Sequence, residues 1–90
     1  MRLIGSPDGR EGSIIIHQDV EIFAALMNAG DAVTRALAAG RRGWVQVVRG
    51  AGEVNGRPVR AGDGVALEDE ATLAVTSRAD DSEFLVFDLP

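Results

Sequence analysis

The chain has 90 residues, no cysteine, one histidine, a formal net charge of −5 at neutral pH and an apolar fraction of 46%. These values predict one small domain with a hydrophobic core, and they exclude disulfide and thiolate chemistry. An acidic domain lacks the basic surface that binds nucleic acid, and no segment has the length of a membrane span or the form of a signal peptide. We therefore expect a cytoplasmic protein with no nucleic-acid partner and no membrane partner.

Turns are predicted where glycine stands beside aspartate or asparagine, because these residues tolerate the positive φ that tight turns require. Such turns are expected at Asp8-Gly9, Gly30-Asp31, Asn55-Gly56 and Gly62-Asp63-Gly64. The Asn55-Gly56 pair is the strongest of them, since Asn-Gly between two short runs is typical of a two-residue type I′ hairpin. The glycine-rich segment Gly5–Gly12 lacks the lysine and spacing of a phosphate loop, and we interpret it as irregular.

Short apolar runs lie between these turns, and several alternate with a period of two. In the last run Phe84, Val86 and Asp88 share one face. Many short strands with regular turns are typical of a β-sandwich or β-barrel, so we predict an all-β fold. In chain order the expected strands are Ser13–His17, Val20–Met27, Val33–Ala38, Trp44–Arg49, Gly52–Val54, Val65–Leu67, Leu73–Thr76 and Phe84–Leu89.

Two segments also carry helical signals. Val20–Asn28 and Asp31–Ala39 are rich in alanine and leucine, which favour helix. Asp31 could cap the start of a helix and Gly40 could follow its end. Propensity alone favours a helix at Asp31–Ala39.

Turn and strand residues spread over nearly the whole chain form a recognisable set. They are Ser6–Gly9, Gly12-Ser13, His17–Asp19, Ala29–Asp31, Gly40–Arg42, Trp44–Gly50, Val54–Gly56, Ala61–Gly64 and Phe87–Leu89. Together they resemble the C-terminal cupin domain of pirin-like bicupins, the group that includes quercetin 2,3-dioxygenase-related proteins. The resemblance implies a small cupin-type β-barrel or sandwich (an RmlC-like jelly roll) over residues 1–90, and it covers only the last part of a family member.

The resemblance also implies where a metal site would lie. The first cupin motif, G-x5-H-x-H-x3,4-E-x6-G, aligns its two glycines with Gly30 and Gly50. Its histidine positions then fall on Ala36 and Ala38, and its glutamate position falls on Gly43. Because histidines two residues apart must both point into the barrel, the alignment favours a strand over a helix in this segment.

The second cupin motif usually has a histidine three residues after a glycine, and here that glycine is Gly62 and the position is Val65. Alanine, glycine and valine side chains cannot bind a metal. We therefore expect no metal, no other cofactor and no catalytic residue in this chain.

Other candidate chemistry is weaker. His17 and Asp19 could form the orienting pair of a hydrolase or a simple surface pair, and the surface pair is the preferred interpretation. The acidic run Glu68–Glu70 is expected to be a solvated loop. The Arg41-Arg42 doublet is expected to be a solvated turn.

The remaining possibility is binding. If the barrel forms, Thr34, Ala36 and Ala38 are expected to face inward and to line a candidate pocket together with Val65. That space either stays open or is filled by larger apolar side chains, and the filled alternative is preferred because protein interiors pack densely.

Candidate interface residues are the sole tryptophan and the apolar positions nearest the termini. Trp44 is interpreted either as an anchor for a partner or ligand, or as a core residue at a barrel end. The apolar segments nearest the termini contain Ile14, Ile16, Phe84 and Phe87, which could pair between two chains because exposed strand edges invite pairing.

The leading functional hypothesis is a metal-free, non-catalytic cupin module of the pirin and quercetinase-like family. Such a module would pack against a metal-bearing cupin partner or against itself as a homodimer. One alternative is a small-molecule-binding barrel that uses the emptied metal cavity. Another is a part of a quercetin 2,3-dioxygenase-type enzyme, although the residues for catalysis are missing from this chain.

Overall fold

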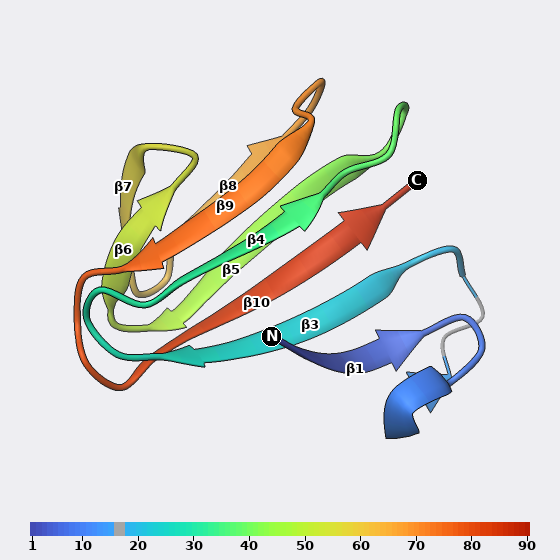
Figure 1. Cartoon of the computed structure of the whole chain (residues 1–90), viewed down its shortest axis with the longest axis horizontal. Coiled ribbons are helices and arrows are strands. Elements are labelled where there is room, and N and C mark those ends of the chain that lie inside the picture. Colours follow the sequence, from blue (N-terminus) through green and yellow to red (C-terminus); the bar gives the residue numbers. More distant parts are fainter. Residues whose placement is uncertain (16–17) are drawn as a thin grey trace.

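The computed structural model describes residues 1–15 and 18–90, which form two facing β-sheets (Figure 1). The larger sheet has the strand order β2-β1-β3-β10-β5-β8, and the smaller sheet has the order β4-β9-β6-β7. A single turn of 3-10 helix, η1 (Arg10–Gly12), precedes β2. The strands are β1 (Arg2–Ser6), β2 (Ile14–Ile15), β3 (Glu21–Met27), β4 (Ala32–Ala36), β5 (Arg42–Arg49), β6 (Ala51–Val54), β7 (Arg57–Arg60), β8 (Gly64–Leu67), β9 (Thr72–Ser77) and β10 (Ser82–Leu89).

The core lies between the two sheets, and it is built from the alternate residues of each strand that point inward. Leu3, Phe23, Ala25, Met27, Val45, Val47, Val65, Leu67, Phe84 and Val86 contribute from the larger sheet or its strand ends, and Leu37, Val54, Val59, Leu73 and Val75 contribute from the smaller one. The predicted all-β fold with two packed sheets is therefore confirmed. Across residues 1–15 and 18–90, the structure contains no helix with the length and apolarity needed to span a membrane.

The C-terminal strand β10 lies in the middle of the larger sheet. It is hydrogen-bonded to β3 on one side and to β5 on the other, as Figure 1 shows. The expectation that Phe84–Leu89 forms an edge that pairs between chains is therefore wrong, because both edges of this strand are already used. Phe84 is fully buried, so its assignment as an interface residue is also wrong.

The segment with both helical and strand signals is a strand. All five residues of β4 pair with β9 in antiparallel register, from Ala32 opposite Thr76 to Ala36 opposite Thr72. Val33, Arg35 and Leu37 alternate with exposed residues along this segment. Packing Val33 and Leu37 against the core outweighs the small helical preference of the alanines.

The predicted Asn55-Gly56 hairpin is present. Asn55 and Gly56 both have positive φ, at 47° and 81°, as a type I′ turn requires. They join β6 to β7 with Val54 opposite Arg57. By contrast, the expectation of an irregular segment at Gly5–Gly12 is partly wrong, because its first two residues belong to β1, which pairs with β3.

A glycine is required at position 50, where β5 turns into β6. Gly50 has φ 87°, and a Cβ added there would lie 2.6 Å from Ser82 Cβ and 2.9 Å from Ser82 Cα. Gly62 has a similar φ of 92°, but an added Cβ would meet no atom within 4 Å. The two positions therefore share the same backbone strain and differ in steric crowding.

We expect Gly50→Ala to lower the free energy of unfolding by about 2–4 kcal/mol, because left-handed strain and overpacking against β10 add together. The matched change Gly62→Ala should cost only about 1–2 kcal/mol, because it introduces the strain alone. Urea unfolding of both variants measures the difference. Equal losses in the two variants would show that position 50 is not crowded.

Candidate functional site

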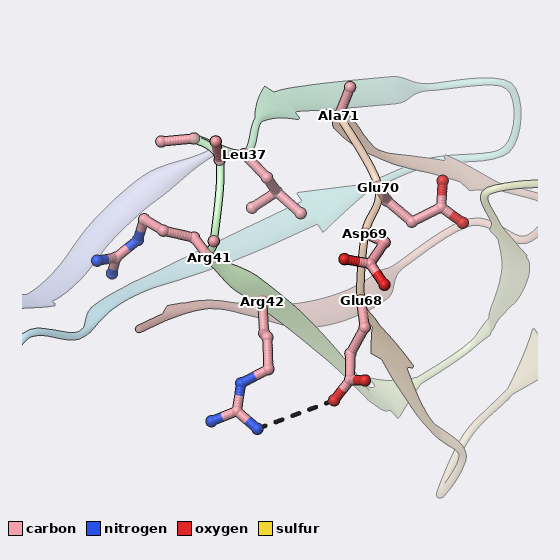
Figure 2. Close-up of a pocket in the computed structure, with 10 residues that line it drawn as sticks. Leu37, Arg41, Arg42, Glu68, Asp69, Glu70 and Ala71 are labelled. Atoms are coloured by element: carbon pink, nitrogen blue, oxygen red, sulfur yellow. Dashed lines mark ion pairs between the residues drawn. The ribbon is translucent and has the colours of Figure 1, made fainter.

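A cleft of about 570 Å³ opens at one end of the two sheets, between the β4–β5 loop and the β8–β9 loop. Residues 37–42 form one wall and residues 68–71 form the other. Leu37 N donates to Ala71 O at 2.9 Å, and Arg42 faces Glu68 at 3.9 Å across the opening (Figure 2). Figure 2 also shows that the Arg41 side chain turns away from the acidic loop.

One residue of the cleft wall, Leu37, also belongs to a group of three leucines that pack against Gly43 of β5. A Cβ added at Gly43 would lie 2.9 Å from Leu73 Cδ1, 3.4 Å from Leu37 Cδ1 and 3.6 Å from Leu67 Cβ. All three leucines are buried. They occupy the space that a larger side chain at position 43 would need, and this position aligns with the metal-binding glutamate of the cupin motif.

Beside the leucines, the buried carboxylate of Asp88 accepts hydrogen bonds from two arginines. Asp88 stands at the inner face of β10 and is 4% exposed. Arg41 Nε donates to Asp88 Oδ1 at 2.5 Å, and Arg35 Nε donates to Asp88 Oδ2 at 2.9 Å. The Arg35 guanidinium also lies 4.5 Å from the centroid of the Phe23 ring. A buried carboxylate is tolerated when its charge is compensated and hydrogen-bonded in this way.

The two arginines extend to further carboxylates nearer the solvent. Arg35 donates to Glu21 Oε2 at 3.1 Å, and Arg10 donates to the same oxygen at 2.5 Å. Arg41 donates to Asp19 Oδ2 at 2.8 Å. Three cations and three anions thus tie η1, β3, β4, β10 and two loops together. We call this set the arginine–carboxylate network: Arg10, Asp19, Glu21, Arg35, Arg41 and Asp88.

The network holds fixed charges. Hydrogen bonds to Asp88 and Asp19 raise the pKa of the Arg41 guanidinium above its usual value, and a hydrogen bond to Glu21 does the same for the pKa of Arg10. Arginine keeps its proton at all physiological pH values. Arg10 and Arg41 therefore act as fixed cations that bind structural elements to one another.

Three of the candidate pocket residues do not face the interior. Thr34, Ala36 and Ala38 are exposed, so the expectation that they point into the barrel is wrong. The inward positions of this segment are the odd-numbered residues, with Arg35 directed to Asp88 and Leu37 to the core. Counting from the motif glycines predicts that Ala36 and Ala38 point inward, whereas the inward residues are each one position earlier, at Arg35 and Leu37.

The other candidates lie in different parts of the fold. Val65 is buried on the inner face of β8, while Ala38 lies on the wall of the cleft at the barrel end. Ile14 is exposed on β2, and Trp44 and Phe87 stand opposite each other on the outer face of the larger sheet. Trp44 is therefore not a core residue. Ile16 and His17 lie outside the described residues.

Sequence reasoning missed Arg35, Arg41 and Asp88. The sequence did contain one signal for Asp88. It shares a strand face with Phe84 and Val86, so the alternation places a charge on an otherwise apolar face. Its partners could not be identified, because the chain has nine arginines and the two that bind Asp88 are 47 and 53 residues away in the sequence.

The residues at this end of the barrel do not fit a metal centre. The inward positions nearest Gly43 carry leucines, and the one buried carboxylate there is already bound by two guanidinium groups. Within residues 1–15 and 18–90, no three His, Cys, Asp or Glu side chains are grouped so that they could hold an ion.

Comparison with known proteins gives a consistent set of relatives. The family described as the quercetinase C-terminal cupin domain matches residues 3–89. Quercetin 2,3-dioxygenase of Escherichia coli (strain K12) is 39% identical over 89 residues, which are 99% of this chain and 38% of that protein. The putative quercetin 2,3-dioxygenase PM1685 of Pasteurella multocida is 34% identical over 97% of this chain and 38% of that protein.

Solved structures of bacterial proteins agree with this. The crystal structure of YhhW from Escherichia coli has a TM-score of 0.95 at 39% identity, covering 99% of this chain and 38% of that one. The structure of bacterial pirin YhhW in complex with nickel(II) has a TM-score of 0.94 at the same identity and coverage. YhaK from Escherichia coli has a TM-score of 0.87 at 26% identity, covering 99% of this chain and 40% of that one. The chain thus spans about two fifths of the length of these relatives.

Removing the buried carboxylate should destabilise the protein strongly. We expect Asp88→Ala to lower the free energy of unfolding by about 2–4 kcal/mol, because Arg35 and Arg41 lose their shared buried partner. The control Glu68→Ala breaks an exposed pair at 3.9 Å and should change stability by less than about 0.5 kcal/mol. Urea unfolding measures both, and similar small losses would show that the network contributes little to stability.

Proposed function

The chain belongs to the quercetinase C-terminal cupin domain family, and on that premise we propose that it is a metal-free, non-catalytic cupin module. Residues 1–90 act as one unit that packs against another cupin domain, or against a copy of itself, and supports the partner's site. The predicted compartment is the cytoplasm.

The observation that carries this proposal is the packed interior around Gly43. Cupins that bind a metal need several imidazole or carboxylate donors that converge on one open position. Here Leu37, Leu67 and Leu73 converge on that region, and the nearest buried carboxylate, Asp88, is held by arginines. This packing around position 43 supports the metal-free part of the proposal.

The larger size of the relatives supports the second half of the proposal. Proteins named quercetin 2,3-dioxygenase carry this domain as 38% of their length, so the larger part of each lies outside it. A domain without donors of its own can still contribute to such a protein by supporting the remaining part. Participation in a quercetin 2,3-dioxygenase-type enzyme therefore remains a proposal about a larger assembly and not about this chain alone.

The alternative function, a barrel that binds a small molecule in the emptied metal cavity, has less support. A ligand in the former metal position would have to displace the leucines that pack on Gly43. The cleft formed by residues 37–42 and 68–71 lies outside that position, at the open end of the barrel. Any pocket role for Thr34, Ala36 or Ala38 would involve the surface of the molecule.

Elemental analysis tests the central part of this proposal. Protein purified without chelator and dialysed should contain no stoichiometric iron, nickel, copper, manganese or zinc, because the inward positions offer no set of donors. Mass spectrometry of the dialysed sample measures this. A near-equimolar metal that survives dialysis, and that is lost in a His17→Ala variant, would contradict the proposal.

A further inference from the structure

The turn between β6 and β7 contains the one Asn-Gly pair of the chain, Asn55-Gly56. An asparagine amide is chemically labile before glycine, because the missing side chain leaves the glycine nitrogen free to attack the amide carbon. The other asparagine, Asn28, is followed by Ala29, whose methyl group hinders the same attack. Position 55 is therefore the place in the sequence where spontaneous deamidation is expected to be fast.

The reaction at this pair needs no partner other than water. The Gly56 backbone nitrogen attacks the Asn55 amide carbon and gives up its proton, and the new carbon–nitrogen bond closes a succinimide ring. The bond from that carbon to Asn55 Nδ2 breaks, and Nδ2 takes up a proton and leaves as ammonia. Water then opens the ring at either carbonyl, which gives an aspartate or an isoaspartate at position 55. Each product carries a negative charge that the amide lacked.

In the folded chain both polar atoms of the Asn55 amide are bound to β9. Asn55 Nδ2 donates to Thr72 O at 2.9 Å, and Asn55 Oδ1 accepts from Ala74 N at 2.7 Å. The backbone nitrogen of Asn55 also donates to Ala74 O at 2.9 Å. The side chain thus continues the β6–β9 ladder beyond its last residue pair. Ring closure requires the amide to turn toward Gly56, so it requires the side-chain hydrogen bonds to break.

The products of the reaction fit this turn less well than asparagine does. A carboxylate at position 55 keeps an acceptor for Ala74 N, but it has no donor for Thr72 O, so two oxygens face each other. The isoaspartate product also lengthens the main chain, because its backbone passes through the former side chain. The type I′ turn, with φ of 47° at Asn55 and 81° at Gly56, is built for a two-residue connection of normal length. Deamidation therefore weakens the hairpin once it has occurred.

The β6–β7 hairpin lies at the edge of the smaller sheet (Figure 1), where local opening is easier than in the middle of a sheet. β7 is the last strand in the order β4-β9-β6-β7, and β6 joins it to β9. The ladder between β6 and β9 is short, running from Gly52 opposite Ser77 to Val54 opposite Val75. Gly56 is exposed, so water reaches the turn. Opening of this edge frees the amide without unfolding the larger sheet.

We propose that Asn55 is a deamidation site that is gated by the pairing of β6 with β9. The paired edge binds the amide and protects it, and each opening of the edge exposes it to attack by the Gly56 nitrogen. Conversion is irreversible because ammonia is lost, and the added charge and the lost hydrogen bond favour further opening of the hairpin. The folded chain thus accumulates modified copies at a rate set by how often this edge opens.

Peptide mass spectrometry tests the proposal on protein incubated at mildly alkaline pH, where succinimide formation is faster. Replacing the amide by a carboxylate raises the mass of the peptide that contains position 55, and the peptide with Asn28 is the internal control. We expect Asn55 to convert about 10-fold or more slowly in the folded chain than in guanidinium chloride, because only the opened fraction reacts. Asn28 should stay largely unmodified in both samples. Equal rates at Asn55 in the two samples, or no conversion in denaturant, would overturn the proposal.

Two matched valine variants separate opening of this edge from unfolding of the whole chain. Val59 of β7 is 7% exposed and Val65 of β8 is 8% exposed, and each lies on the last strand of its own sheet. Val59→Ala should raise the rate at Asn55 in the folded chain by about 5-fold or more, because it loosens the hairpin. Val65→Ala should change that rate by less than about 2-fold, because it loosens the other sheet. Circular dichroism checks that both variants are folded, and equal acceleration in the two would contradict the gate.

Discussion

The structure depends on the placement of β10 between β3 and β5 in the middle of the larger sheet. Both of its edges are hydrogen-bonded and both of its faces are used. Phe84 and Val86 point into the core and are fully buried, and Asp88 continues the same face to the barrel end. Leu85 and Phe87 point outward. One eight-residue strand therefore contributes to the core, to the arginine–carboxylate network and to the outer face of the larger sheet.

The core and the arginine–carboxylate network are linked by charge compensation at Asp88. A carboxylate at the end of an otherwise apolar face must be compensated, and Arg35 and Arg41 supply the compensation from β4 and the loop that follows it. The arginines then fix the loop beside Gly43, where leucines fill the interior. An interior stabilised by packing and by fixed charges is the basis of our proposal that the domain contributes a packing surface, and no metal site, to other molecules.

Much of the fold could be predicted from the sequence because local rules determine it. The Asn55-Gly56 hairpin follows from the φ values that this pair tolerates. The strand predicted at Val33–Ala38 follows from the family motif, against a residue propensity that favours helix. The family itself was identified from residues spread along the chain and is confirmed by the match over residues 3–89.

The candidate site was harder to predict, for physical reasons. The side chains of the β4 segment that point inward are those that pack best. They are Arg35 and Leu37, whereas counting from the glycines had selected Ala36 and Ala38. The central position of β10 arises from pairing between residues 82–89 and strands tens of residues away. No local pattern records that pairing, so the assignment of Phe84 to an interface was wrong.

The most direct test of this account is an amide NMR titration with nickel(II), the ion present in the similar YhhW structure. If the leucines fill the interior around Gly43, the amide signals of Leu37, Gly43 and Leu67 should keep their line widths when one equivalent of the ion is added. Saturable paramagnetic broadening centred on these three amides would show that the interior admits a metal, and it would contradict the account.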